Sequence, residues 1–218
     1  MEPSKSGVAP EILHVKTSAK PADEELPPYP GISLSDVVLV RTPPELIEAC
    51  AALLASPVLG FDTESKPTFR PGEVSTGPHL IQLATAQKVF LFQVGRAPLP
   101  EALNEVLQAV LAAPGSLKVG FGLRDDLKRL QLKYDIRAEN VLDLAVALRQ
   151  NSRQDMGAKT AVAHFFGQRL QKSKKTSTTN WSLPTLSDAQ ILYAANDAQV
   201  ALRVYLKWRE LSGQVVSI

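Results

Sequence analysis

Residues 58–65 read VLGFDTES, an apolar run that predicts a buried strand and ends in two carboxylates spaced one residue apart. Side chains on a strand alternate between its two faces, so Asp62 and Glu64 point one way while Phe61 and Thr63 point the other. Two like charges on a covered strand repel each other and lose water. A bound cation, a pair of Arg or Lys side chains, or exposure at the strand end would each offset this cost.

The pattern of the whole chain predicts an α/β fold with a mixed central sheet flanked by helices. Apolar runs rich in Val, Ile and Leu predict strands at Val37–Val40, Val58–Phe61, Leu80–Ala84, Val89–Phe92, Leu117–Gly120 and Val141–Leu144. Helical periodicity predicts helices at Pro44–Ala55, Pro100–Ala112, Leu123–Tyr134, Ala158–Phe166 and Ser187–Leu211. The stretch HLIQLATAQKVFLFQV predicts a hairpin that turns at Thr85–Lys88, so the sheet is not purely parallel.

Length and composition bound the organisation of the chain. Its 218 residues and 44% apolar content can supply a sizeable core. We expect a Pro-rich, extended or flexible tail over residues 1–31 and a single domain over residues 32–218. The sequence has neither a signal-peptide pattern nor a run of about 18 apolar residues that could span a membrane. Because Cys50 is the one cysteine, an intrachain disulfide and a cysteine zinc site are excluded, and we predict a soluble, cytoplasmic protein.

A second acidic pair lies in KVGFGLRDDLKRL, residues 118–130, where a helix is predicted to begin. The predicted buried stripe of this helix is Leu123, Leu127, Leu130 and Tyr134. Asp126 lies about 60° from the centre of the stripe, at the border between core and cleft, while Asp125 lies nearly opposite and faces solvent. Either residue could instead be a first-turn acid favoured by the helix dipole. The GFG fragment is not a dinucleotide-binding loop, because Asp125 replaces the third glycine of GxGxxG.

A buried acid is predicted on the last helix, in YAANDA at residues 193–198. Asp197 falls within about 40° of the middle of an apolar stripe, where a carboxylate is costly unless a cation or hydrogen bonds receive it. Tyr193 lies one turn earlier on the same face, so its hydroxyl and the Asp197 carboxylate can address one site. The alternative is an aspartate whose charge is satisfied by a neighbouring donor.

Asp62, Glu64, Asp126 and Asp197 together indicate a metal site. They come from a strand, a helix edge and a late helix, and each is flanked by predicted core residues. Oxygen ligands without a His or Cys cluster suit hard cations such as Mg²⁺ or Mn²⁺ rather than zinc. Two such ions roughly 4 Å apart can activate a water, hold a phosphate and stabilise a leaving oxygen. The implied chemistry is phosphodiester hydrolysis.

A basic segment precedes the last helix. From Arg153 to Lys175 the sequence contains six Lys or Arg residues, and Asp155 is the one acidic residue among them. The net charge of the whole chain is only +2. Within this segment, Lys172, Lys174 and Lys175 are candidates for contact with a phosphate backbone. A solvated surface loop is the alternative interpretation.

The motifs FDTE, GFGLRDDL and YAANDAQ, in this order, resemble the three exonuclease motifs of the DEDD superfamily. A tyrosine four residues before the last aspartate resembles the DEDDy branch of that superfamily. The intervening LIQLAT and the stretch NWSLPTLSDAQILYAANDA are similar to the ribonuclease D and Werner-syndrome exonuclease domains. The similarity extends from Val37 to Leu211, nearly the whole of the predicted domain.

The resemblance implies a ribonuclease H-like fold and 3′-to-5′ hydrolysis that releases nucleoside 5′-monophosphates by a two-metal mechanism. It implies that Asp62, Glu64 and Asp197 hold a first divalent cation, Mg²⁺ or Mn²⁺, and that Asp62 also reaches a second. Asp126 would hold the second cation. Tyr193 would orient the attacking water, because a hydroxyl with an ordinary pKa of about 10 is a better hydrogen-bonding group than a base.

The substrate is expected to be single-stranded or 3′-ended DNA or RNA. The chain has no helicase segment and no room after Leu211 for the helical nucleic-acid-binding domains of ribonuclease D, so we expect a stand-alone exonuclease domain. In the Pro/Gly-rich loop after FDTE, Lys66 or Phe69 is predicted to contact the 3′ nucleotide, and a plain surface role is the alternative. Trp181 is expected to anchor the core rather than stack on a base.

Two other functions compete with the exonuclease. A catalytically idle nucleic-acid-binding module would keep the fold and the basic segment, but the presence of all four carboxylates and the tyrosine counts against it. A different hydrolase or nucleotide-binding protein is disfavoured because the sequence contains no P-loop, nucleophile elbow or complete glycine fingerprint.

Overall fold

Six strands form a mixed sheet in the order β1-β4-β3-β2-β5-β6. They are β1 (Val37–Val40), β2 (Val58–Glu64), β3 (Leu80–Ala84), β4 (Val89–Gln93), β5 (Leu117–Gly120) and β6 (Val141–Asp143). Strand β3 is antiparallel to both of its neighbours, and the other neighbouring pairs are parallel. This computed structural model describes residues 25–68, 70, 72–95, 98–149 and 154–213.

The helices are α1 (Pro43–Leu54), α2 (Glu101–Leu111), α3 (Arg124–Tyr134), α4 (Leu144–Ala147), α5 (Ala158–Phe166), α6 (Lys174–Ser177) and α7 (Asp188–Leu211), with a 3-10 turn, η2, at Leu34–Asp36. The predicted strands and helices are confirmed to within a few residues. Helices α4 and α6 were not predicted, because four residues complete about one turn and show no periodicity. Within the described ranges, no helix is both long and apolar enough to cross a membrane.

The predicted hairpin between β3 and β4 is also confirmed. The backbone N–H of Thr85 donates to the carbonyl of Lys88 at 2.9 Å, and the Thr85 hydroxyl oxygen accepts from the Lys88 N–H at 3.0 Å. This turn reverses the chain within the sheet, so that β4 runs back alongside β3.

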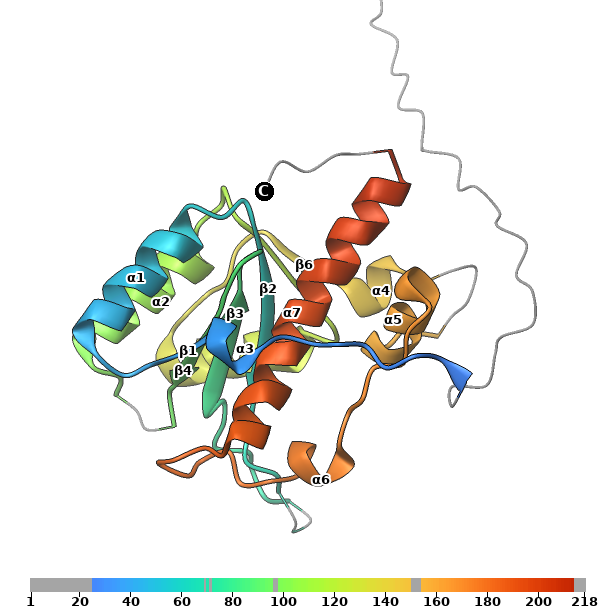
Figure 1. Ribbon diagram of the computed structural model, residues 1–218. Coiled ribbons are helices and arrows are strands. Elements are labelled where there is room, and N and C mark those ends of the chain that lie inside the picture. The colour runs from blue at the N-terminus through green and yellow to red at the C-terminus, as the bar shows by residue number, and fades with distance from the viewer. Residues whose placement is uncertain (1–24, 69, 71, 96–97, 150–153, 214–218) are drawn as a thin grey trace, which may run out of the picture.

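Helices cover both faces of the sheet, and α7 crosses one face over β2 and β3 (Figure 1). Val58 and Ala84 point toward this face and join the core beneath α7. Phe61 and Leu83 point the other way, into a second core shared with α1, α2 and α3. The alternation predicted for β2 therefore gives it two buried faces. Burial decreases at the end of the strand, where Asp62 and Glu64 are only half-buried.

The chain that enters the domain lies against α7 and against the linker between α5 and α6. The N–H of Tyr29 donates to the carbonyl of Arg169 at 2.9 Å. The N–H of Ile32 donates to the side-chain oxygen of Asn196 on α7 at 2.9 Å. Tyr29 and Ile32 are both buried. Residues 27–32 therefore tie the α5–α6 linker to the middle of α7.

Gly60 allows α7 to approach β2 closely. A Cβ atom at this position would collide with the backbone carbonyl of Ala198 and would lie 3.1 Å from the Cβ of Ala84. Because Ala198 follows Asp197, this close approach sets how near the Asp197 carboxylate comes to β2. The small residues on both elements thus fix the distance between strand and helix where the polar residues begin.

We expect Gly60→Ala to destabilise the protein by about 1–3 kcal/mol, because the added methyl group must push α7 away from β2. Urea unfolding at neutral pH measures this loss. Gly115→Ala is the matched control, since a Cβ there meets nothing within 4 Å. Equal stability of the two variants would contradict the close approach.

Candidate active site

The end of β2 presents two acids on the face that α7 covers. Asp62 and Glu64 are half-buried, while Thr63 between them is buried and points to the other face. The side chain of Asp62 also accepts the N–H of Thr63 at 2.9 Å. The predicted arrangement of these side chains on the strand is therefore confirmed.

Helix α7 brings a third acid to the same face. The side chain of Asp197 is only 6% exposed, and burial raises the pKa of its carboxyl while Lys172 and the nearby hydroxyl of Tyr193 lower it. Trp181 supports this arrangement, because its ring lies 6.0 Å from the ring of Tyr193 and its indole N–H donates to the carbonyl of Ser177 at 3.3 Å. Trp181 is 1% exposed, which confirms its predicted place in the core.

Asp126 approaches from α3, on the opposite side of β2. The Thr63 hydroxyl donates to Asp126 Oδ1 at 2.5 Å, and Arg129 lies 3.6 Å from the same oxygen. Asp126 is half-buried and Asp125 is exposed, as predicted. The hydrogen bond through Thr63 thus ties the α3 acid to the strand that carries Asp62 and Glu64. We call Asp62, Glu64, Asp126 and Asp197 the acidic cluster.

Lys172 extends into the acidic cluster from the linker between α5 and α6. Its Nζ lies 2.8 Å from Asp197 Oδ1 and 5.8 Å from the centre of the Tyr193 ring. The charges of Asp62 and Glu64 act on the same ammonium. One lysine therefore faces three carboxylates.

The electrostatics of the cluster follow from burial of like charges. Burial, together with the charges of Asp197 and Asp126, raises the pKa of Asp62 well above its ordinary value. Burial and the charge of Asp62 raise the pKa of Glu64 to about 9. Burial also raises the pKa of Asp126 and of Asp197, against the lowering effect of Lys172 on Asp197. Lys172 and Arg129 therefore do not fully compensate the negative charge that these four carboxylates carry when they are ionised.

The donor chemistry fits hard divalent cations, since every member of the acidic cluster offers carboxylate oxygen. Gln82 adds unmet hydrogen-bonding capacity: it is fully buried opposite Asp62 on β3, and its amide N and O have no partner among the described residues. In the described part of the chain, however, no three Asp, Glu, His or Cys side chains are arranged as a group that could hold a metal ion. A cation would thus require the side chains of the cluster to rearrange.

The loop after β2 is fixed at its base by three side chains. The N–H of Lys66 donates to Nδ1 of the buried His79 at 3.0 Å. The ammonium of Lys133 on α3 donates to the carbonyls of Thr76 at 2.5 Å and Pro78 at 3.0 Å. The hydroxyl of Tyr134 donates to the carbonyl of Pro78 at 3.1 Å. Helix α3 therefore holds both Asp126 and the loop next to Glu64.

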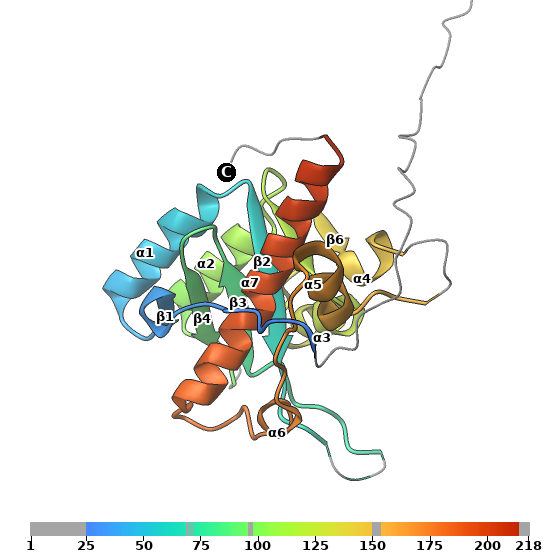
Figure 2. The same ribbon diagram turned by 45° about the vertical axis from the view of Figure 1, so that its right-hand side comes forward.

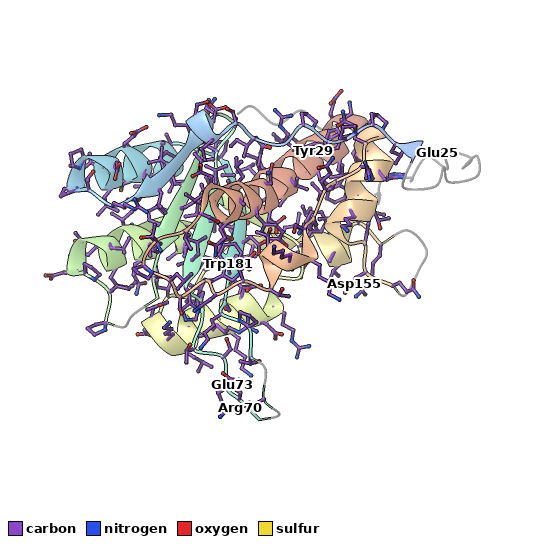
Figure 3. The ribbon with its side chains drawn as sticks, turned by 60° about the horizontal axis from the view of Figure 1, so that its bottom comes forward. Glu25, Tyr29, Arg70, Glu73, Asp155 and Trp181 are labelled. Atoms are coloured by element: carbon purple, nitrogen blue, oxygen red, sulfur yellow. The ribbon has the colours of Figure 1, made fainter. Side chains whose placement is uncertain are left out.

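The predicted nucleic-acid contacts lie around one end of the sheet. Lys66 is exposed at the start of the loop after β2, and Lys174 and Lys175 are exposed on α6. Figure 2 shows α6 and this loop at the same end of the molecule as the start of α7. Figure 3 shows Arg70 and Glu73 on the projecting part of the loop. Phe69 lies outside the described residues, so its predicted contact stays a prediction.

Residues 37–211 match the protein family described as 3′-5′ exonuclease, which is well over half of the chain. The chain belongs to this family. Its predicted kinship with the ribonuclease D and Werner-syndrome exonucleases is thereby confirmed. The matched range contains the whole acidic cluster together with Tyr193 and Lys172.

Individual relatives agree with this membership. The bifunctional 3′-5′ exonuclease/ATP-dependent helicase WRN of Mus musculus is 30% identical over 153 residues, which are 69% of this chain and 11% of that protein. Ribonuclease D of Acidiphilium cryptum is 31% identical over 179 residues, 81% of this chain and 43% of that protein. The catalytic core of RRP6 from Trypanosoma brucei has a TM-score of 0.67 at 26% identity and covers 84% of this chain and 49% of that one.

These comparisons confirm the predicted ribonuclease H-like fold. The chain spans less than half the length of each of the three relatives.

Several residues of the site were not singled out by the sequence. Gln82 had a readable signal, because it is a lone amide in the apolar strand LIQLA and its register with Asp62 follows from the hairpin. Thr63 was placed on the opposite face, but its bond to Asp126 depends on where α3 packs. His79 and Lys133 had no signal, since their partners lie in a loop whose sequence shows no periodicity.

We expect His79 to make the protein less stable as the pH falls from about 6.5 to about 4. Burial, with the charges of Lys133 and Lys66, lowers the pKa of His79 to about 4, whereas the ordinary value is near 6.5. The unfolded chain therefore takes up a proton first, and acid favours unfolding in this window. Urea unfolding of the wild type and His79→Gln between pH 7 and 4 should give stabilities that converge at low pH.

Parallel profiles for the wild type and His79→Gln would show that His79 is not held neutral by the fold.

Proposed function

We propose that this protein is a metal-dependent exonuclease of the DEDDy type, which shortens nucleic acid from its 3′ end and releases nucleoside 5′-monophosphates. The observation that carries the proposal is the acidic cluster, in which carboxylates from β2, α3 and α7 act on one another's charges. The cluster occurs in a chain of the 3′-5′ exonuclease family. A divalent cation would offset buried like charges of this kind, and it would also supply the charge that a two-metal phosphodiester hydrolysis uses.

Each member of the cluster has a proposed role as ligand. Asp62, Glu64 and Asp197 would hold a first Mg²⁺ or Mn²⁺, and Asp126 would hold a second that Asp62 also reaches. When bound, two such ions lower the pKa of a water and stabilise the leaving oxygen. Both observed contacts of Asp126 use Oδ1, so we propose Oδ2 as its ligand atom.

Tyr193 is proposed to orient the attacking water as a hydrogen-bond donor. Burial, followed by the charges of Asp197 and Glu64, raises the pKa of this hydroxyl above its ordinary value, so it keeps its proton at neutral pH. A hydroxyl that keeps its proton is a poor general base. The charges of Asp197, Glu64 and Asp62 all act on this hydroxyl, which therefore lies next to the cluster.

The substrate is proposed to be single-stranded or 3′-ended DNA or RNA. The exposed Lys66, Lys174 and Lys175 lie around the end of the sheet that carries the cluster and would contact the phosphate backbone. Phe69 would stack on the terminal base. We also propose a cytoplasmic location, consistent with the single cysteine. The predicted tail over residues 1–31 was placed too far along the chain at its end, because residues 27–31 pack against the domain, so we propose a tail that ends before Pro27.

The direct test is a gel assay with 5′-labelled single-stranded DNA, 3′-recessed duplex DNA and single-stranded RNA, each with Mg²⁺, Mn²⁺ or EDTA. We expect a metal-dependent ladder that shortens from the 3′ end, with nucleoside 5′-monophosphates as products on thin-layer chromatography. Retained binding without cleavage of any substrate would favour an idle nucleic-acid-binding module instead. The Lys172–Asp197 ion pair is the observation that favours that second candidate.

Asp62→Asn is expected to lower turnover on the order of 10³-fold or more, because it removes a charge on which several kcal/mol of transition-state stabilisation depend. In EDTA its melting temperature should equal or exceed that of the wild type, since one repelling buried charge is gone. Asp125→Asn is the matched control, because Asp125 is exposed on α3. Substantial cleavage by Asp62→Asn would refute the assignment.

Tyr193→Phe is expected to lower kcat about 10- to 100-fold while KM changes little, because one positioning hydrogen bond is lost and no ligand is removed. Single-turnover and steady-state assays on the preferred substrate separate the two effects. A variant as active as the wild type would show that the tyrosine only packs against Trp181.

A further inference from the structure

Lys172 is the cation that the fold itself supplies to the acidic cluster. Its Nζ lies 2.8 Å from Asp197 Oδ1, with the Asp197 side chain 6% and the Lys172 side chain 28% exposed. The charges of Asp62 and Glu64 also stabilise the ammonium. These are the carboxylates proposed as ligands of the first divalent cation.

We infer that Lys172 competes with the divalent cation for Asp197, and that cation binding releases Lys172 toward the substrate. This inference rests on the proposed function. An ammonium and a divalent cation on one carboxylate repel each other strongly where water is scarce. The carboxylate cannot satisfy both at full strength, so each must weaken the binding of the other. The lack of a group of three metal-ready side chains among the described residues fits this exchange, since Asp197 is engaged by Lys172.

The linker around Lys172 is anchored on both sides, so only the side chain needs to move. Before it, the N–H of Arg169 donates to the carbonyl of Pro27 at 2.8 Å, and Leu170 is buried. After it, the Ser173 hydroxyl oxygen accepts the N–H of Thr176 at 3.2 Å and caps α6. A released ammonium therefore stays within one side-chain length of the cluster.

Isothermal titration with Mn²⁺, on the full chain without nucleic acid, tests the competition. Lys172→Met is expected to bind Mn²⁺ about tenfold more tightly than the wild type, because removing the internal competitor frees Asp197. Lys174→Met is the matched control, since it removes the same charge two residues away on the exposed face of α6. Lys172→Arg should bind Mn²⁺ like the wild type, because the competing charge is kept.

Unchanged or weaker binding by Lys172→Met, or an equal gain in Lys174→Met, would overturn the competition. A measurement on the wild type covers the case in which Lys172→Met does not fold. In a ¹⁵N-lysine NMR spectrum of the wild type, the Nζ signal of Lys172 is identified as the one that is missing from Lys172→Arg. The chemical shift of this signal should change when Mg²⁺ is added. A signal that Mg²⁺ leaves in place would also overturn the inference.

The outcome also separates this inference from the proposed function. Wild-type cleavage that needs Mn²⁺, together with an unchanged affinity in Lys172→Met, would remove the competition and keep the exonuclease. A wild type and a Lys172→Met variant that neither bind Mn²⁺ nor cleave any substrate would remove both.

Discussion

Burial of like charges where β2 meets α7 is the constraint on which the rest of the structure depends. Asp62, Glu64 and Asp197 lie on elements whose other residues form the apolar core, so the packing that stabilises the fold also takes water from these carboxylates. Their raised pKa values express that cost. The cost persists only because the contacts of β2 and α7 are supported along their whole length, far beyond the three acids.

The backbone around the acids is built to bring them close. A side chain at Gly60 would hold β2 and α7 apart, because Ala198 presents its carbonyl at that point. The bond from Ile32 to Asn196 fixes α7 from its outer side, next to Asp197. On the other side of β2, Thr63 links the strand to Asp126. Each device acts on a residue adjacent to an acid, so small backbone shifts are transmitted directly to the carboxylates.

The sequence predicted which face of a strand or helix each acid lies on, because this depends on periodicity. It did not predict which group each polar side chain contacts. Period-2 alternation placed Asp62 and Glu64 on one face, and helical periodicity placed Asp126 at an edge and Asp197 in a core. The partner of Lys172 could not be predicted, because a lysine is attracted by a carboxylate and by a phosphate alike. The contact of Lys133 with the loop could not be predicted either, because its acceptors are backbone carbonyls, which every sequence provides.

Thermodynamic linkage implies that the Lys172–Asp197 ion pair would couple the binding of the divalent cation to the binding of nucleic acid. If one ammonium serves Asp197 in the protein alone and a phosphate in the complex with substrate, the divalent cation and the nucleic acid must each raise the affinity for the other by the same factor. The cation removes the carboxylate partner of Lys172, and the phosphate removes the competitor of the cation. The cluster would then be filled most strongly when a 3′ end is present, and in its absence Lys172 would hold the buried carboxylates in the folded state.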